Sequence, residues 1–137
     1  MLPDPKKTAL PSKAAGVGAL TTKQVGDAAE DQALRHLTRA GLRLVQRNYR
    51  TPGRGGGEID LIMREPDGTT VFIEVRTRGS RSHGGAAASV SATKQRRIIF
   101  AARCYLMKLN TPPPCRFDVV TIEAGEVDWI RGAFEAG

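Results

Sequence analysis

Two acidic residues near the centre of the sequence lie on neighbouring runs of alternating apolar and polar residues. Asp60 belongs to the run from Gly57 to Met63, and Glu74 belongs to the run from Val71 to Arg78. This alternation is typical of half-buried strands. The Pro-Asp-Gly sequence at 66–68 favours a tight turn between the two runs. The sequence therefore predicts a β-hairpin that carries both acids.

The length of the turn determines which residues of the hairpin lie opposite each other. A loop over 66–68 or 65–69 pairs Arg64 with Thr70 and sets Asp60 opposite Glu74, with Cβ atoms about 4.5–5.5 Å apart. Two neighbouring carboxylates repel each other, so we expect a compensating positive charge. A divalent cation bound by carboxylate oxygens is one candidate, and the guanidinium of Arg76 is the other.

Strand alternation also assigns side chains to the two faces of the hairpin. On the first strand, one face should carry Glu58, Asp60 and Ile62, and the opposite face should carry Ile59, Leu61 and Met63. On the second strand, one face should carry Phe72, Glu74 and Arg76, and the opposite face should carry Val71, Ile73 and Val75.

These residues resemble the core of PD-(D/E)xK nucleases, in which an Asp and a Glu on adjacent strands bind a metal. Further motifs resemble the YraN-like family of uncharacterised bacterial proteins, which are similar in fold to archaeal Holliday-junction resolvases. They are Gly26, Glu30 and Ala33, Gly41, Asn48-Tyr49-Arg50, Gly57–Ile62, Phe72–Arg76, Lys94 and Arg116–Val120. The resemblance covers residues 23–123. It implies a restriction-endonuclease-like fold and action on nucleic acid.

The resemblance also implies a metal site. Asp60, Glu74 and the backbone carbonyl of Val75 would hold Mg²⁺ or Mn²⁺ as hard oxygen ligands. Glu30 lies within the apolar stripe of a predicted helix, so its carboxylate needs a partner or a proton. Related resolvases use such a glutamate to complete the metal site, whereas the alternative is a salt bridge to a core arginine such as Arg76.

The lysine that normally follows the second acid of the nuclease pattern is replaced here by Arg76. A guanidinium stays protonated at any working pH, so it can stabilise phosphate charge but cannot transfer a proton. Lys94 lies in the first turn of a predicted helix, close in helical phase to the inward stripe. It is therefore the candidate to replace the missing amine, or else its stem lies over apolar surface with the amine in water.

Positive charge surrounds these acids along the chain. The net charge is +7, and the basic stretches on either side of the hairpin contain no acid between Gln32 and Gly57 or between Val75 and Phe117. A basic surface around a small acidic cluster favours a polyanion partner, although an arginine-rich solvated surface is the alternative. The candidate nucleic-acid contacts are Arg47, Arg50, Arg54, Arg78, Arg81 and Arg96. An aromatic content of 5% argues against a base-stacking platform.

The remaining pattern predicts an α/β sandwich of αβββαβ type, with a central mixed sheet flanked by helices and one further short strand. We expect a disordered basic tail at 1–22, one endonuclease-like domain at 23–131 and a frayed C-terminus at 132–137. The helices should span 22–40, capped by Thr21 or Thr22 and ended by Gly41, and 92–109, capped by Ser91 or Thr93. Other strands should span 42–50, with Leu44 facing the core, 116–123 and 127–130, and a flexible glycine-rich loop should span 51–57.

Two functions remain open from the sequence. The first is a metal-dependent endonuclease acting on DNA, branched or damaged, for which a homodimer would cut two strands symmetrically. The second is a non-catalytic nucleic-acid-binding domain with the same fold. His83 could serve as a general acid or base in a loop, or be merely exposed. We expect a cytoplasmic protein with free thiols at Cys104 and Cys115, because no apolar run has the length of a signal peptide core or a membrane span.

Overall fold

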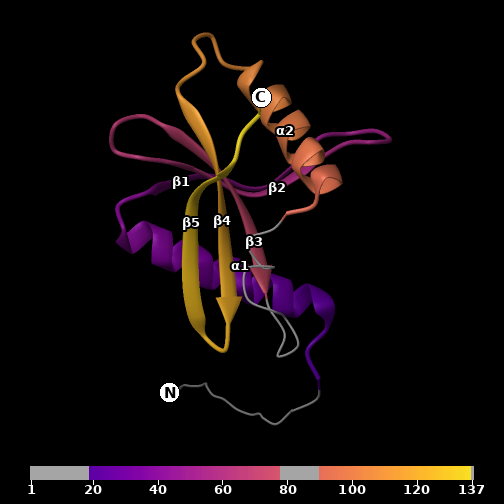
Figure 1. The fold of residues 1–137 in the computed structure, drawn as a ribbon, viewed down its shortest axis with the longest axis vertical. Coiled ribbons are helices and arrows are strands. Elements are labelled where there is room, and N and C mark those ends of the chain that lie inside the picture. The colour runs from indigo at the N-terminus through magenta and orange to yellow at the C-terminus, as the bar shows by residue number, and fades with distance from the viewer. Residues whose placement is uncertain (1–18, 78–89, 137) are drawn as a thin grey trace, which may run out of the picture.

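The structure is a computed structural model that describes residues 19–77 and 90–136 (Figure 1). Within these residues a helix is followed by three strands, a second helix and two further strands. The elements are α1 (Thr22–Arg39), β1 (Arg43–Arg50), β2 (Glu58–Arg64), β3 (Thr70–Thr77), α2 (Ala92–Leu106), β4 (Cys115–Glu123) and β5 (Glu126–Phe134). The predicted order of elements is confirmed. Most of the tail predicted over 1–22 lies outside the described residues.

The strands form one mixed sheet with the order β1-β2-β3-β4-β5. Strands β3 and β4 run parallel, whereas the other neighbouring pairs are antiparallel. A parallel pair requires a crossover connection, and α2 lies between these two strands in the chain. The predicted α/β class with a mixed sheet is therefore confirmed.

The two helices pack against separate hydrophobic clusters on the two faces of the sheet (Figure 1). Helix α1 contributes Ala29, Ala33 and Leu37 to a cluster with Leu61, Met63, Val71 and Ile73. Helix α2 contributes Ile98, Ala101, Ala102 and Tyr105 to a cluster with Ile62, Phe72 and Phe117. Neither helix among the described residues is long and apolar enough to cross a membrane. The sheet is thus buried on both sides at the centre of β2 and β3.

Local sequence signals fix the ends of the helices. The side chain of Thr21 accepts a hydrogen bond from the Gln24 amide at 3.0 Å, and the Gln24 side chain accepts one from the Thr21 amide at 2.9 Å. This reciprocal capping box satisfies amides that the first turn leaves unpaired. Gly41 follows α1 with φ of 107°, a conformation that glycine adopts without strain. Helix α1 thus begins and ends where the sequence indicates, and Ser91 caps α2 as one of the two expected residues.

The hairpin of β2 and β3 has the predicted register. Arg64 pairs with Thr70, and the pairing continues to Leu61 with Ile73. The turn is closed by hydrogen bonds from the Glu65 amide to the Thr69 carbonyl and from the Gly68 amide to the Glu65 carbonyl, each 2.9 Å. The Pro-Asp-Gly turn therefore sets the register that brings the two acidic positions together.

The predicted assignment of faces is wrong at Ile59. Ile59 packs with Ile62 in the cluster beneath α2, whereas Leu61 packs in the cluster beneath α1. The neighbouring strand contains Asn48 with φ of 51°, opposite the break in alternation. A residue in the left-handed conformation changes the direction in which the side chains of its strand point, and Asn tolerates this conformation better than most residues. Tyr49 consequently joins Ile59 in the cluster beneath α2.

Two further expectations about strands differ from the structure. Leu44 does not face the core, because it is 39% exposed on an edge strand whose register shifts between Leu44 and Gln46. Strand β5 extends to Phe134 instead of ending at 130. Phe134 pairs with Phe117, and the two rings stack with centroids 5.1 Å apart. Helix α2 ends at Leu106, earlier than expected.

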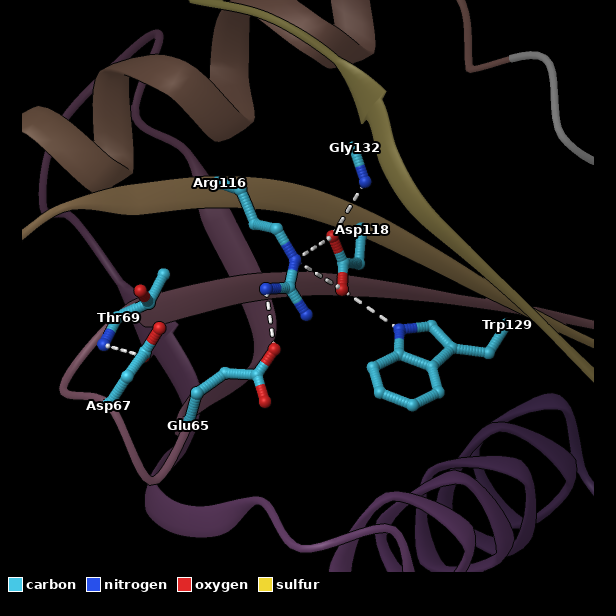
Figure 2. A network of polar contacts seen from close by, with 7 residues as sticks. All are labelled: Glu65, Asp67, Thr69, Arg116, Asp118, Trp129 and Gly132. Atoms are coloured by element: carbon cyan, nitrogen blue, oxygen red, sulfur yellow. Dashed lines mark hydrogen bonds and ion pairs between the residues drawn. The ribbon is translucent and has the colours of Figure 1, made fainter.

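A buried carboxylate ties β4 to β5 and to the hairpin turn (Figure 2). Asp118 is fully buried and accepts hydrogen bonds from Arg116 Nε at 3.0 Å, Trp129 Nε1 at 2.8 Å and the Gly132 amide at 2.9 Å. Arg116 also pairs through Nη1 with Glu65 Oε2 at 2.6 Å. Buried carboxylates need such partners, because an unpaired charge is costly inside a protein. We infer that this network is structural.

Replacing Asp118 should therefore destabilise the protein strongly. Asp118→Ala leaves the Arg116 guanidinium and the Trp129 indole without their acceptor, which should lower the free energy of unfolding by about 3 kcal/mol. Urea denaturation followed by far-UV circular dichroism measures this change. Arg131→Ala is the matched control, because it removes only an exposed guanidinium stacked 3.9 Å from the Trp129 ring centroid and should cost about 1 kcal/mol or less. Equal losses in the two variants would contradict the structural role.

Candidate active site

Asp60 and Glu74 meet where the pairing of β2 and β3 ends. The paired residues stop at Leu61 and Ile73, one position before the two acids. Instead of a backbone bond, Asp60 Oδ2 accepts a hydrogen bond from the Val75 amide at 2.8 Å. The carboxyl groups of Asp60 and Glu74 are themselves within hydrogen-bonding reach. The expected juxtaposition of Asp60 and Glu74 is thus present.

Both carboxyl groups have raised pKa values. Burial raises the pKa of Asp60 to about 7, and the charge of Glu74 adds to the effect, while the hydrogen bond from the Val75 amide opposes it. Burial also raises the pKa of Glu74, against the nearby positive charges of Lys94 and Arg76. Close carboxylates in a buried site cannot both ionise without a free-energy cost. Near neutral pH the pair therefore tends to keep a proton unless a cation replaces it.

Lys94 approaches this pair from the other side of the site. Its Nζ lies 3.7 Å from Glu74 Oε2. Lys94 stands in the first turn of α2, where its backbone amide donates to the Ser91 side chain at 3.1 Å. The N-cap thus orients the turn that carries the lysine. The placement expected from helical phase is observed, and a role in catalysis stays a prediction.

Glu30 approaches the acidic pair from α1. Burial and the charge of Asp60 raise the pKa of Glu30, and Arg47 opposes the shift. Arg47 Nη2 lies 3.6 Å from Glu30 Oε1, which accepts no hydrogen bond from residues 19–77 and 90–136. An arginine thus lies beside Glu30, as in the salt-bridge alternative named above, and the arginine observed there is Arg47. Arg47 also pairs with Asp31 at 2.8 Å, so this predicted nucleic-acid contact is held by two carboxylates.

Glu30, Asp60 and Glu74 are neighbours, but their side chains are not arranged as a set of metal ligands. Among residues 19–77 and 90–136, no group of three His, Cys, Asp or Glu side chains is arranged to hold a metal ion. Asp60 and Glu74 are in mutual contact, whereas Glu30 lies against Arg47. A metal ligand set that includes Glu30 therefore stays a prediction and requires Glu30 to leave Arg47.

Two open pockets flank the acidic pair and share Lys94. The first, of about 480 Å³, is lined by Glu74, Val75, Arg76, Thr77, Ser91 and Lys94. The second, of about 360 Å³, lies between the loop at 51–57 and α2, and its charged lining residues are Arg50, Glu58, Lys94 and Arg97. The acidic pair thus opens onto a surface with several cationic side chains.

The structure says less about the remaining residues that were predicted to contact nucleic acid or to act in catalysis. Arg54 is exposed on the loop before β2 and lines neither pocket. Arg96 is exposed and donates to the Thr93 hydroxyl at 3.2 Å. Arg78, Arg81 and His83 lie outside the described residues.

Sequence reasoning missed Glu58 and Arg97 as members of the site. The charge of Glu58 contributes to the raised pKa values of both Asp60 and Glu74. Arg97 follows Lys94 by three residues, which places both on adjacent parts of one helix face. The spacing of three residues from Lys94 could have identified Arg97 as a member of the site. The position of Glu58 two residues before Asp60 could have identified Glu58.

The raised pKa of Asp60 predicts a specific pH dependence of stability. Its folded-state pKa of about 7 exceeds the value of about 3.9 in an unfolded chain. The stabilisation from the bound proton is therefore complete below about pH 4 and lost as pH rises through about 7. Between about pH 5 and pH 8, wild type should lose about 2 kcal/mol more of its unfolding free energy than Asp60→Asn.

Urea denaturation at a series of pH values in the presence of a chelator measures this difference. Asp128→Asn is the control, because it removes one exposed carboxylate far along the chain in β5. Stability curves of wild type and Asp60→Asn that stay parallel from pH 5 to pH 8 would show that Asp60 titrates normally.

Comparison with known proteins places the chain in a family. Residues 29–122 match the model of the uncharacterised protein family UPF0102. The chain is 77% identical over 116 residues to a UPF0102 protein of Albidiferax ferrireducens, which covers 85% of this chain and 91% of that protein. It is 61% identical over 132 residues to a UPF0102 protein of Paracidovorax citrulli, which covers 96% of each chain. The matched span includes Glu30, Asp60, Glu74 and Lys94, so all the motifs that resemble the YraN-like family except Gly26 lie within it, and the chain belongs to family UPF0102.

Proposed function

We propose that the protein is a metal-dependent endonuclease that acts on DNA, with branched or damaged DNA as the substrate class. The observation that carries the proposal is the contact between the half-buried carboxyl group of Asp60 and the buried one of Glu74, beside the amine of Lys94. A fold of the restriction-endonuclease-like type and a homodimer that cuts two strands belong to the same proposal.

The acidic pair fits a divalent cation by its chemistry. Asp60 and Glu74 supply carboxylate oxygens, and the Val75 carbonyl supplies a third hard ligand, as Mg²⁺ or Mn²⁺ prefers. Burial raises the pKa values of both acids, and the charge of Glu74 adds to the shift at Asp60. A cation bound between the two carboxylates would offset the free-energy cost of ionising both. A bound cation would lower the pKa of a water molecule and neutralise charge on the phosphate under attack.

The residues around the pair have separable roles in this proposal. The Val75 amide holds the Asp60 carboxylate in place through its hydrogen bond of 2.8 Å. Lys94 orients the attacking water or exchanges a proton with it, as the lysine of the nuclease pattern is thought to do. Arg76 lines the same pocket and stabilises negative charge on the scissile phosphate.

The acids favour catalysis over simple binding. Phosphate binding gains from Arg50, Lys94 and Arg97 but loses from nearby carboxylates. A domain that only binds DNA has no use for Asp60 and Glu74 in mutual contact at a free-energy cost. The second candidate, a non-catalytic DNA-binding domain, would require these acids to serve only as partners of Lys94 and Arg76.

Cleavage of DNA by matched lysine variants tests the proposal. Wild type should cut a four-way DNA junction or supercoiled plasmid with Mn²⁺ or Mg²⁺ and should be inactive with a chelator. Lys94→Ala should lower the cleavage rate by about 100-fold or more if the amine handles a proton, because general acid–base catalysis contributes about 10²–10⁴-fold. Lys94→Arg should fail to restore the rate, since it returns the charge without a neutral form.

Two further variants complete the comparison. Arg76→Lys restores the lysine of the nuclease pattern and should retain or raise activity. Arg103→Ala changes an exposed residue near the far end of α2 and should leave the rate unchanged within a few-fold. Lys94→Ala at the wild-type rate would rule out the role of Lys94, and absence of metal-dependent cleavage on all these substrates would favour the binding domain.

A further inference from the structure

The loop at 51–57 has a defined conformation that leaves a pocket beside the acidic pair. The Thr51 amide donates to the Gly57 carbonyl at 3.0 Å, and the Gly57 amide donates to the Thr51 hydroxyl at 2.6 Å. Gly56 donates to the Gly53 carbonyl at 3.2 Å. These hydrogen bonds join the two ends of the loop and define its conformation in the structure, whereas the flexibility expected from its glycine content stays a prediction.

Close contact between this loop and α2 forms the wall of the pocket. A Cβ atom on Gly57 would lie 1.9 Å from the Arg97 carbonyl oxygen and 3.2 Å from the Ala101 methyl group. Only glycine therefore allows the chain to enter β2 at this distance from the helix. The loop and the first turns of α2 consequently enclose an open pocket of about 360 Å³.

The charges that line this pocket suit a phosphate group. Arg50, Lys94 and Arg97 are cationic, and Glu58 is the acid that lines it. Glu58 is already paired with Arg50 at 3.2 Å. Arg97 is exposed and forms no ion pair within the described part of the chain. Within the part of the chain that the structure describes, no aromatic side chain lines the pocket, so no ring is present there on which a base could stack.

We propose that this pocket binds an internal backbone phosphate adjacent to the scissile one on the same DNA strand, with Arg97 and Arg50 as its contacts. Lys94 lines this pocket and also the pocket at Glu74, so the two spaces adjoin. A strand whose scissile phosphate lies at Glu74 and Lys94 therefore directs its neighbouring phosphate toward Arg97. The assignment rests on the proposed function, because the acidic pair defines which phosphate is the scissile one.

Phosphate contacts can be counted from the salt dependence of DNA binding. Each neutralised phosphate contributes about 0.9 to the slope of log affinity against log salt concentration for duplex DNA. Arg97→Ala and Arg50→Ala should each reduce the magnitude of the slope by about 0.9, measured by fluorescence anisotropy with the full chain, a chelator and a short labelled duplex. Arg103→Ala, an exposed arginine of the same helix outside both pockets, should leave the slope unchanged.

Two forms of the probe distinguish an internal phosphate from a terminal one. The effect of Arg97→Ala should be equal on duplexes with 5′-hydroxyl and with 5′-phosphate ends. An effect confined to 5′-phosphate ends would overturn the assignment to an internal phosphate.

The outcomes also separate this inference from the proposed function. If Arg97→Ala and Arg103→Ala have the same slope as wild type, the subsite is wrong even when wild type cleaves DNA. If the slope falls as expected while wild type never cleaves, the pocket still binds phosphate but its neighbour is not a scissile one, which overturns the adjacency stated here.

Discussion

The hydrogen bond from the Val75 amide to Asp60 holds a carboxylate where two strands separate, and the chemistry of the site depends on it. Strands β2 and β3 are paired up to Leu61 and Ile73, and the bond of 2.8 Å replaces the next backbone contact. This places the half-buried Asp60 against the buried Glu74, and both acids have raised pKa values. Holding two carboxyl groups together costs free energy. Apolar packing on both faces of the hairpin offsets this cost, since α1 covers one face and α2 the other.

Asp118, a buried carboxylate elsewhere in the same sheet, has hydrogen-bond donors for both of its oxygens. Asp118 accepts bonds from Arg116, Trp129 and the Gly132 amide, and all its donors are fixed by β4 and β5 (Figure 2). The pair of Asp60 and Glu74 has one backbone donor on Asp60 and the amine of Lys94 at 3.7 Å from Glu74. Asp60 and Glu74 therefore have fewer fixed donors than Asp118, and for this reason we propose that a cation binds at Asp60 and Glu74.

Much of the framework could be predicted because local signals specify it. The capping box at Thr21, Gly41 after α1 and the Pro-Asp-Gly turn each fix a boundary or a register through neighbouring residues. The register then determines the juxtaposition of Asp60 and Glu74, and helical phase places Lys94 beside them. Family membership was equally accessible, since it is carried by short motifs along the chain.

The remaining features depend on contacts between distant segments. Asn48 adopts a left-handed conformation on β1 opposite the break in alternation between Ile59 and Leu61, and nothing in its neighbours specifies that conformation. Strand β5 is extended by the pairing of Phe134 with Phe117, which a search for local alternation does not detect. The contact of Gly57 with the Arg97 carbonyl joins a loop to a helix about forty residues away, so the second pocket was invisible in the sequence.

The most direct test of the central claim is a calorimetric titration of Mn²⁺ into wild type and into the Asp60→Asn/Glu74→Gln double variant. Both proteins are titrated alone and with a branched DNA. The account predicts saturable binding to wild type that is lost in the double variant, because the variant retains the shape of the site but not its two negative charges. Absence of saturable binding to folded wild type, even with DNA present, would contradict the account and leave Asp60 and Glu74 as internal partners of basic side chains.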